Sequence, residues 1–193
     1  MRSDELKKAK RAVRRAVLAA RDAVPEVERA RRGARVAERF LGLPEVMAAG
    51  SVLLFWSFGS EVPTPPLIEA LHARGVRTAL PRIVEGEIEV RSFLPGDPMT
   101  ETSFGAREPS GGERLAEVDV VCTPGVAFDL GGRRIGYGGG FYDRLLPGIP
   151  AAARIAIAFD LQVREEPLPS GRFDEPVDAL VTESRVLRWD RPR

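Results

Sequence analysis

The chain alternates short apolar runs with segments whose apolar residues recur at helical spacing, and this alternation constrains the fold more than any other feature. Runs rich in valine, isoleucine, leucine and alanine indicate buried strands at residues 52–56, 76–80, 118–122, 154–159, 178–182 and 186–189. Buried strands that alternate with helices favour an open, mostly parallel sheet covered on both faces. The sequence therefore predicts an α/β fold, a three-layer α/β/α arrangement around such a sheet.

Two helices are expected before the first strand, as an N-terminal helical extension of the fold. Residues 3–24 carry apolar side chains on one helical face, at Leu6, Ala9, Val13, Ala16, Val17 and Ala20. Pro25 suits the first turn of a second helix, which is expected to end near Leu41.

The remaining segments complete the sheet and its connections. A helix is expected over residues 65–74, ended by Gly75. Residues 88–93 alternate apolar and polar side chains and indicate an edge strand, whereas residues 95–114 are rich in proline, glycine, serine and charge and indicate a loop. Because no linker or internal repeat divides the chain, we expect residues 1–193 to form a single α/β domain.

Composition narrows the cellular setting. No apolar run is long enough to span a membrane, and the N-terminus lacks the apolar segment of a signal peptide. The single cysteine, Cys122, lies in a strand-like run and has no partner for an internal disulfide. We therefore expect a cytoplasmic protein that does not associate with membranes and is a monomer or weak dimer.

Positive charge is concentrated near the N-terminus. Residues 1–40 contain 13 lysines and arginines against 6 aspartates and glutamates, although the net charge of the chain is only +1. Lys7, Lys10, Arg14 and Arg21 form a stripe beside the apolar face of the first helix. A solvated helix surface, a phosphate-rich ligand and a nucleic acid each explain such a stripe.

Four glycines fall within five positions at residues 136–140, interrupted only by Tyr137. Each glycine in an ordered segment costs about 0.5–1 kcal/mol relative to alanine, so the run needs a reason. It follows a hairpin expected at residues 126–135 and precedes a short helix expected at 141–146, stopped by Pro147. Backbone N–H groups and the dipole at such a helix start favour phosphate. A tight turn with positive φ is the alternative, but it needs only one or two glycines, so four favour phosphate binding. The spacing matches neither a Walker loop nor the dinucleotide fingerprint.

Asp143 lies close to the expected phosphates, where its charge would be repelled unless a cation intervenes. Mg²⁺ commonly binds through one or two carboxylates and phosphate oxygens, so Asp143 is a candidate ligand; a helix-start carboxylate is the alternative. Arg134 and Arg144 flank the loop, and Lys10 and Arg14 could close over the same phosphates. The only histidine, His72, is expected at the surface or in packing, and no convincing nucleophile is present.

Residues 124–146 resemble the signature of the 5-formyltetrahydrofolate cyclo-ligase family, also called methenyltetrahydrofolate synthetases: PGVAFDLGGRRIGYGGGFYDRLL. Residues 10–21 (KRAVRRAVLAAR) resemble its N-terminal basic helix, and residues 57–71 (SFGSEVPTPPLIEAL) its Ser…Glu-Val-x-Thr segment. Residues 104–109 (FGAREP) and 173–183 (FDEPVDALVTE) follow in the family's order. The chain departs from the pattern at Phe141, where many members have tyrosine, and at Phe173, where a histidine is frequent.

The resemblance implies an enzyme that uses ATP and Mg²⁺ to close 5-formyltetrahydrofolate to 5,10-methenyltetrahydrofolate, with release of ADP and phosphate. In this reaction the formyl oxygen takes the γ-phosphoryl group, N10 attacks the activated carbon, and phosphate departs. Positioning and charge stabilisation suffice for such a transfer, so no enzyme nucleophile is implied.

The resemblance also implies roles for individual residues. The residues implied to bind ATP are Lys10, Arg14, Arg134, Ile135, Gly136, Tyr137, Gly138, Gly139, Gly140, Phe141 and Tyr142. Those implied to hold Mg²⁺, directly or through water, are Asp143 and Asp178. Those implied to bind the folate substrate are Trp56, Glu61, Tyr137, Gly138, Gly139, Gly140 and Phe141, with Glu61 gripping the pterin or orienting the N5-formyl region. The implied partner is a small molecule, and neither a nucleic acid nor a membrane.

Two other classes of protein remain open from the residues alone. A nucleic-acid-binding protein would explain the basic helix, although residues 1–24 lack stacking aromatic side chains. A sugar-phosphate isomerase or an acyl-carrier transferase of similar architecture would turn over its own substrate without ATP.

Overall fold

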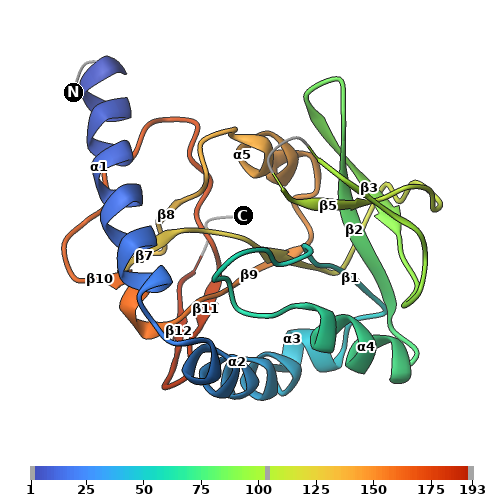
Figure 1. Ribbon diagram of the computed structural model, residues 1–193. Helices are drawn as coiled ribbons and strands as arrows, with labels where there is room; N and C mark the ends of the chain where they lie inside the picture. Colours follow the sequence, from blue (N-terminus) through green and yellow to red (C-terminus); the bar gives the residue numbers. More distant parts are fainter. Residues whose placement is uncertain (1–2, 103–104, 191–193) are drawn as a thin grey trace.

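A seven-stranded sheet forms the centre of the computed structural model, which describes residues 3–102 and 105–190 (Figure 1). The strand order is β12-β11-β9-β6-β1-β2-β3. The inner strands run parallel to one another, and the edge strands β12 and β3 run antiparallel to their neighbours. The strands are β1 (Ser51–Leu53), β2 (Arg77–Val84), β3 (Glu87–Ser92), β6 (Val120–Thr123), β9 (Ala153–Ile157), β11 (Ala179–Val181) and β12 (Val186–Arg188). The predicted open, mostly parallel α/β sheet is confirmed.

The inner strand β1, which lies between β6 and β2, shows why the strands read as continuous apolar runs. Successive side chains of a strand point to opposite faces of the sheet. Val52 and Leu54 belong to the core on one face, whereas Leu53 packs with Leu146 and Ile149 on the other. Because both faces are buried, apolar residues are needed at every position.

Helices α2 (Glu26–Leu41), α3 (Pro44–Met47) and α4 (Pro65–Ala73) cover one face of the sheet (Figure 1). Proline opens α4 within its first turn, where the missing N–H has no partner to lose. Phe40 of α2 is completely buried against the sheet. Gly75 follows α4 with a φ of +77°, which explains the helix end predicted there.

Short elements cover the opposite face, in place of long helices. They are α5 (Phe141–Leu145), the 3₁₀ turns η1 (Leu146–Gly148) and η2 (Asp160–Gln162), and a small sheet of β7 (Ala127–Asp129), β8 (Arg134–Ile135) and β10 (Val163–Arg164). Strands β7 and β8 are antiparallel, which confirms the predicted hairpin. Pro147 ends α5 as an α-helix, but the chain continues through it as η1, since a first-turn proline needs no N–H partner.

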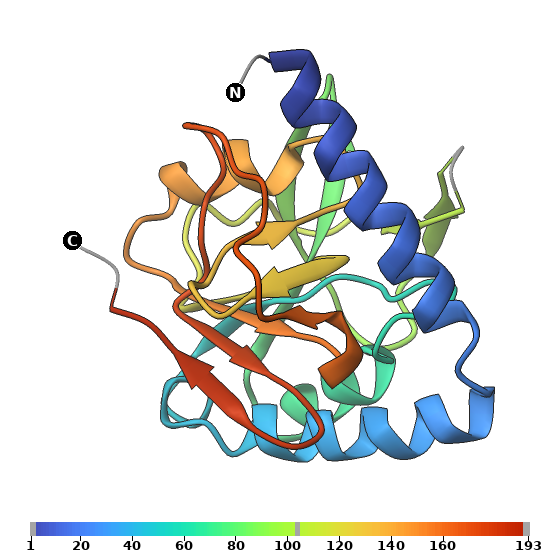
Figure 2. The same cartoon turned by 90° about the vertical axis from the view of Figure 1, so that its left-hand side faces the viewer.

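Helix α1 (Ser3–Asp22) crosses the molecule beside the β7–β8 hairpin (Figure 2). Its predicted apolar side is confirmed in part: Val17 is buried and Leu6, Ala9 and Val13 are half-buried, but Ala16 and Ala20 are exposed. Helix α1 packs on the hairpin and the adjoining glycine loop, and Arg14 and Arg21 of the basic stripe bind groups of that loop. Lys7 is exposed, so only the rest of the stripe faces inward.

The prediction of a plain loop over residues 95–114 is wrong in part. Strands β4 (Met99–Glu101) and β5 (Arg107–Pro109) form an antiparallel pair within it, too short and too polar to give an apolar pattern. Phe104, in the segment compared with the family, lies outside the described residues. Strand β1 also ends at Leu53, earlier than predicted, because the chain leaves the sheet toward Glu61. Within residues 3–102 and 105–190, no helix is long and apolar enough to cross a membrane.

Candidate active site

The glycine loop, residues 136–140, connects β8 to α5. Gly138 and Gly140 have φ values of +117° and +67°, conformations that L side chains rarely adopt. A side chain on Gly139 would overlap the ring of Phe141, at 2.7 Å from Cδ2. The conformation of the loop therefore accounts for three of the four glycines, so their number alone does not indicate a phosphate. Support for phosphate binding must therefore come from the charged side chains around the loop.

Two arginines contact the backbone of the glycine loop. Arg14 Nε donates to the carbonyl oxygen of Gly136 at 2.7 Å, and Arg144 Nη1 donates to that of Gly139 at 3.0 Å. Burial lowers the pKa of Arg14, as does the neighbouring Arg11, yet a guanidinium remains charged in proteins. The loop is thus bordered by two fixed cations, the groups that bind phosphate best.

Lys10 lies one turn before Arg14 on the same side of α1. Its Nζ donates to both carboxylate oxygens of Asp174, at 2.6 and 2.5 Å. Asp174 Oδ2 also accepts the backbone N–H of Gly171 at 2.6 Å, which fixes the carboxylate. Lys10 therefore reaches inward as predicted, and its partner is a carboxylate that the sequence did not single out.

Arg134 and Asp143 form an ion pair next to the loop, with Nη2 and Oδ1 2.7 Å apart. The Arg134 side chain is only 4% exposed; burial lowers its pKa, and the charge of Asp143 opposes that shift. Oδ1 of Asp143 also accepts the backbone N–H of Glu175 at 3.2 Å. Since these contacts use Oδ1, the second oxygen, Oδ2, is the atom suited to a cation.

Asp178 immediately precedes β11, where its Oδ2 accepts the backbone N–H of Arg154 at 2.9 Å. Arg154 Nη1 pairs with Glu175 at 2.6 Å, and the N–H of Glu175 binds Asp143. The two expected Mg²⁺ ligands are thus connected through Arg154 and Glu175. Among the described residues, no group of three or more His, Cys, Asp or Glu side chains is arranged to hold a metal, so Mg²⁺ would need oxygens from a ligand.

Glu61 lies in the segment that follows β1, and it is buried. Its Oε1 accepts the hydroxyl hydrogen of Tyr137 at 2.7 Å, and its Oε2 accepts the N–H of Phe58 at 3.0 Å. Burial raises the pKa of Glu61, while the Tyr137 and Phe58 hydrogen bonds and the charge of Arg21 oppose the rise. The structure thus brings Glu61 into direct contact with the glycine loop.

The aromatic site candidates differ in exposure. Trp56 is half-buried, edge-on to Phe93 at 6.0 Å between ring centres, with the Arg107 guanidinium 5.4 Å from its ring. Phe141 lies under the Arg144 guanidinium at 5.2 Å. The buried hydroxyl of Tyr142 has no hydrogen-bond partner in the described part of the chain, and burial raises its pKa.

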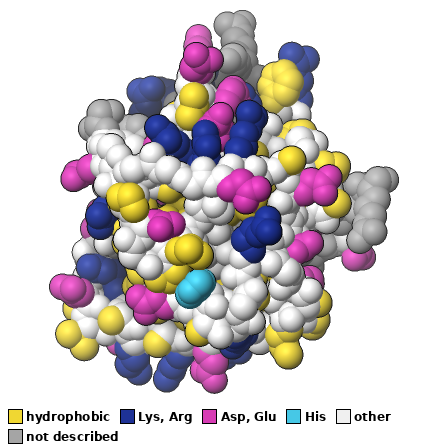
Figure 3. Space-filling model, turned by 90° about the vertical axis from the view of Figure 1, so that its right-hand side faces the viewer, with side chains coloured by type: hydrophobic (Ala, Val, Ile, Leu, Met, Phe, Trp, Pro, Cys, Tyr) yellow, Lys and Arg dark blue, Asp and Glu magenta, His cyan; other side chains and the backbone are white. Residues whose placement is uncertain are grey.

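Three further candidates lie where they can contribute little as side chains. Ile135 is buried, so only its backbone can meet a ligand. Cys122 is fully buried in β6, where burial raises the pKa of its thiol. His72 is exposed on α4, on a face where acidic, basic and hydrophobic side chains are mixed (Figure 3). The expectation of a surface histidine is confirmed.

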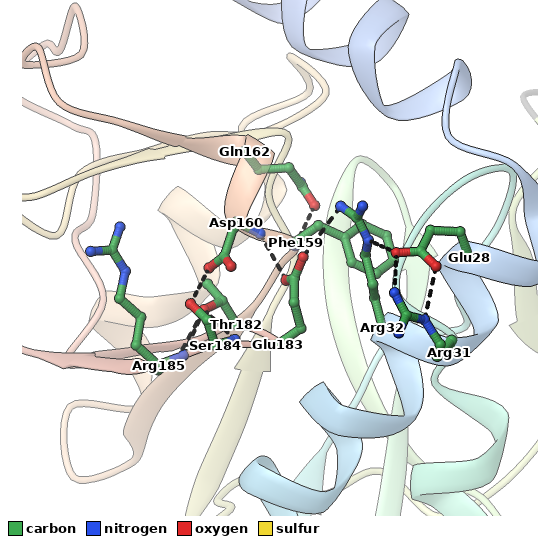
Figure 4. Close-up of polar contacts among 10 residues, drawn as sticks. All are labelled: Glu28, Arg31, Arg32, Phe159, Asp160, Gln162, Thr182, Glu183, Ser184 and Arg185. Carbon is green, nitrogen blue, oxygen red and sulfur yellow. Dashed lines mark hydrogen bonds and ion pairs between the residues drawn. The ribbon is translucent and has the colours of Figure 1, made fainter.

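A separate polar cluster closes the carboxyl edge of the sheet beyond β9 and β11 (Figure 4). Glu183 accepts the N–H of Asp160 at 2.8 Å and lies 3.5 Å from Arg32 Nη1. Arg32 also pairs with Glu28, as does Arg31, and the two arginines lower the pKa of Glu28 to about 2. The cluster ties α2 to this part of the edge. The candidate active site is built instead from the segments that follow β1 and β6.

Two residues of the site were missed or given no role from sequence. Arg21, known only as part of the basic stripe, donates to Ser60 Oγ and Tyr137 Oη. Its spacing from Lys10 and Arg14 on one helical face was the available signal. Asp174 gave none, because its contact with Lys10 spans 164 positions of the chain.

These features define an α/β protein whose candidate ligand site lies beyond the carboxyl ends of inner parallel strands, between a basic helix and a glycine loop. Comparison with known sequences assigns the chain to one family. The chain belongs to the 5-formyltetrahydrofolate cyclo-ligase family, whose sequence profile matches residues 6–183.

Individual relatives agree with this assignment. The 5-formyltetrahydrofolate cyclo-ligase of Escherichia coli is 36% identical over 166 residues, which cover 81% of this chain and 91% of that protein. The protein of the same name from Haemophilus influenzae is 34% identical over 155 residues, covering 76% and 83%. The NMR structure of Aquifex aeolicus 5,10-methenyltetrahydrofolate synthetase superposes with a TM-score of 0.84 at 36% identity, covering 95% of this chain and 94% of that one.

Proposed function

We propose that this protein uses ATP to close 5-formyltetrahydrofolate to 5,10-methenyltetrahydrofolate, with release of ADP and phosphate. Membership of the cyclo-ligase family supports this reaction. The observation that carries it for this chain is the hydrogen bond between Tyr137 of the glycine loop and Glu61. It joins a loop bordered by cations to a buried carboxylate, as a reaction between a phosphoryl donor and a folate requires.

The ATP phosphates would bind along the glycine loop, residues 136–140, between Arg14 and Arg144. Both guanidiniums already contact loop carbonyls. Arg144 also donates to Glu87 and to the carbonyl oxygen of Gly86, so its second hydrogen on each Nη atom is what remains for phosphate oxygens. Lys10 would add one charge: two of its three N–H groups bind Asp174, which leaves the third for phosphate. Arg134 would supply charge from the buried side, and the backbone of Ile135 and the ring of Tyr142 would border the same ligand.

Mg²⁺ would bind through Asp143 together with phosphate oxygens, with Asp178 contributing directly or through water. The donor chemistry fits, because Asp143 keeps Oδ2 available beside the loop, and Mg²⁺ often uses few protein ligands with substrate phosphates. When bound, the ion would supply charge neutralisation at the triphosphate.

The folate substrate would lie on the other side of the loop. Glu61, held by Tyr137 and Phe58, would accept N–H groups of the pterin or orient the N5-formyl region. Trp56 would provide an apolar wall. The backbone at Gly138, Gly139 and Gly140 and the rings of Tyr137 and Phe141 would line the space between the two substrates.

The chemistry then needs alignment and charge rather than a protein nucleophile. The formyl oxygen attacks the γ-phosphorus of ATP, and the bond from that phosphorus to ADP breaks. N10 of the folate attacks the activated carbon of the imidate phosphate, and phosphate leaves with its electron pair. The cations around the loop would stabilise the charge that develops on the transferred group.

The direct test is to mix the protein with 5-formyltetrahydrofolate and Mg-ATP and to follow the absorbance of the methenyl product. We expect turnover that requires all three components and releases one ADP for each product molecule. Turnover of equal rate without ATP, or none by folded protein, would refute the proposal.

Two rival classes receive less support. A nucleic-acid-binding protein conflicts with the family assignment, and the buried cation of the basic stripe, Arg21, binds groups of the protein itself. An isomerase or acyl-carrier transferase conflicts with the family assignment. A single domain, a monomer or weak dimer, and a cytoplasmic location stay predictions from the sequence.

A further inference from the structure

Arg21 is the buried cation of the basic stripe, and the proposed reaction gives it no role. It lies about three turns beyond Lys10 on α1, on the same side of the helix. The residue is only 3% exposed, whereas the helix carries other arginines, such as Arg15, at its surface. Burying a guanidinium is unfavourable unless its donors are used, so its partners explain its position.

Those partners lie on the two segments that meet at the site. Arg21 Nε donates to Ser60 Oγ at 2.9 Å, and Arg21 Nη2 donates to Tyr137 Oη at 2.9 Å. Ser60 is the residue before Glu61, and Tyr137 belongs to the glycine loop. A single side chain of α1 therefore ties the Glu61 segment to the loop.

The direction of these hydrogen bonds is fixed by chemistry. A guanidinium donates and cannot accept, so both hydroxyl oxygens must act as acceptors toward Arg21. Their hydrogens point onward: Ser60 donates to Asp22, and Tyr137 donates to Glu61 Oε1 at 2.7 Å. Arg21 thus aims the Tyr137 hydroxyl at Glu61.

We propose that Arg21 is a positioning residue of the folate site, which acts through Tyr137 to hold the Glu61 carboxylate in place. The inference rests on the proposed function in one respect, namely that Glu61 accepts N–H groups of the pterin. An ionised carboxylate accepts such donors with both oxygens, whereas a protonated one presents an O–H.

The groups around Glu61 support this role. Arg21 from α1 and the Tyr137 hydroxyl oppose the effect of burial on the Glu61 pKa. Cys122 from β6 and Tyr142 from α5 lie within electrostatic reach, and burial holds the pKa of each well above neutrality, so both are uncharged. Asp22 adds a carboxylate beyond Ser60. Among the described residues, Arg21 is the one cation whose charge lowers the pKa of Glu61.

The sign of the expected effect follows. Burial raises the pKa of Glu61, and the positive charge of Arg21 opposes that rise. Without Arg21 the pKa rises further, so Glu61 becomes protonated at a higher pH and folate binding is lost from the acid side earlier. An opposite charge nearby shifts a carboxyl pKa by about one unit or more, so we expect the change to be of that size.

The test compares wild type with Arg21→Met, Arg21→Lys and the surface control Arg15→Met. The Glu61 carboxyl is titrated by ¹³C NMR in ligand-free protein, and 5-formyltetrahydrofolate and ATP affinities are measured by calorimetry across the same pH range. We expect Arg21→Met to move the Glu61 midpoint and the acid limit of folate binding up together, by about one pH unit. Arg21→Lys should restore part of the shift, and ATP affinity and Arg15→Met should match wild type.

The outcomes are separable. An unchanged Glu61 midpoint in Arg21→Met, with folate binding weakened equally at every pH, would overturn the role of Arg21. If Arg21→Met does not fold, Tyr137→Phe removes the same connection at a partly exposed position and should raise the midpoint as well. A wild-type protein that binds no 5-formyltetrahydrofolate would refute the proposed function, while the NMR titration would still decide whether Arg21 controls Glu61.

Discussion

Lys10 and Asp174 form an ion pair across 164 positions of the chain, with Nζ 2.6 and 2.5 Å from the two carboxylate oxygens. The pair ties the N-terminal helix to the segment before β11. Both side chains are about one-fifth exposed, so the pair sits at the margin of the site and a ligand can reach it. Asp174 therefore holds the ammonium beside the glycine loop without using all of its donors.

We expect Lys10→Ala to weaken ATP binding while folate affinity stays close to wild type. Loss of the lysine removes a charge near the phosphates, but Asp174 remains partly solvated and keeps its bond to Gly171, so the stability loss should be at most about 1 kcal/mol. ATP dissociation constants at two salt concentrations check this, with the exposed Lys8→Ala as control. Equal ATP affinities at low salt for Lys10→Ala and wild type would remove Lys10 from the site.

Strand positions were predictable because burial on both faces leaves a largely apolar run, as at residues 120–122 of β6. The β4–β5 pair could not be predicted from the sequence, because its strands are short and carry polar side chains that any loop would tolerate. The buried side of α1 was predicted in part. Apolar periodicity marks Val13 and Val17, which meet the hydrophobic core, but it gives no sign of Arg21, which is buried against polar groups.

The candidate site was predictable where its residues are consecutive, as in residues 134–143. Contacts between residues far apart in the chain could not be predicted in this way. No local pattern indicates that Asp174 will contact Lys10, which lies 164 positions earlier in the chain. The reason given for the glycines also changed: positive φ and the Phe141 ring require three of them, whatever the loop binds.

Gly138→Val is expected to weaken ATP binding severely. A β-branched side chain resists a φ of +117°, so the loop must shift, and the added carbon would lie in van der Waals contact with the Arg14 guanidinium at 3.5 Å, so the shift occurs next to Arg14. Gly96→Val is the matched control, because Gly96 has a φ of +97° with nothing within 4 Å of the added carbon. Each variant should lose about 1–2 kcal/mol of stability. Calorimetry that finds equal ATP affinity in both would limit the glycine to a role in the turn.

Leu53→Ala should destabilise the fold without a specific effect on either substrate. Leu53 is completely buried in the inner strand β1, on the face that packs against Leu146 and Ile149. Truncation leaves a cavity there, so we expect a loss of about 2–5 kcal/mol in the free energy of unfolding. Denaturant unfolding measures it. A loss below that range would mean that the short elements on this face collapse onto the sheet more easily than its packing indicates.

Asp143→Asn tests the proposed Mg²⁺ ligand, and the structure changes what the variant should do. Asp143 balances Arg134, whose side chain is 4% exposed, so the amide leaves a buried cation without its counter-charge. We therefore expect a loss of about 1–3 kcal/mol in stability even if no metal binds there. Stability alone cannot separate a metal ligand from a counter-ion.

Glu175→Gln supplies the comparison, because it breaks an ion pair of the same kind. Arg154 and Glu175 are 2.6 Å apart with side chains 4% and 27% exposed, against 2.7 Å, 4% and 25% for Arg134 and Asp143. Both variants should lose similar stability. If Asp143 binds Mg²⁺, only Asp143→Asn should raise the Mg²⁺ concentration needed for half-maximal turnover, and added Mg²⁺ should recover part of the activity. An equal Mg²⁺ requirement in the two variants would leave Asp143 as the counter-ion of Arg134 and nothing more.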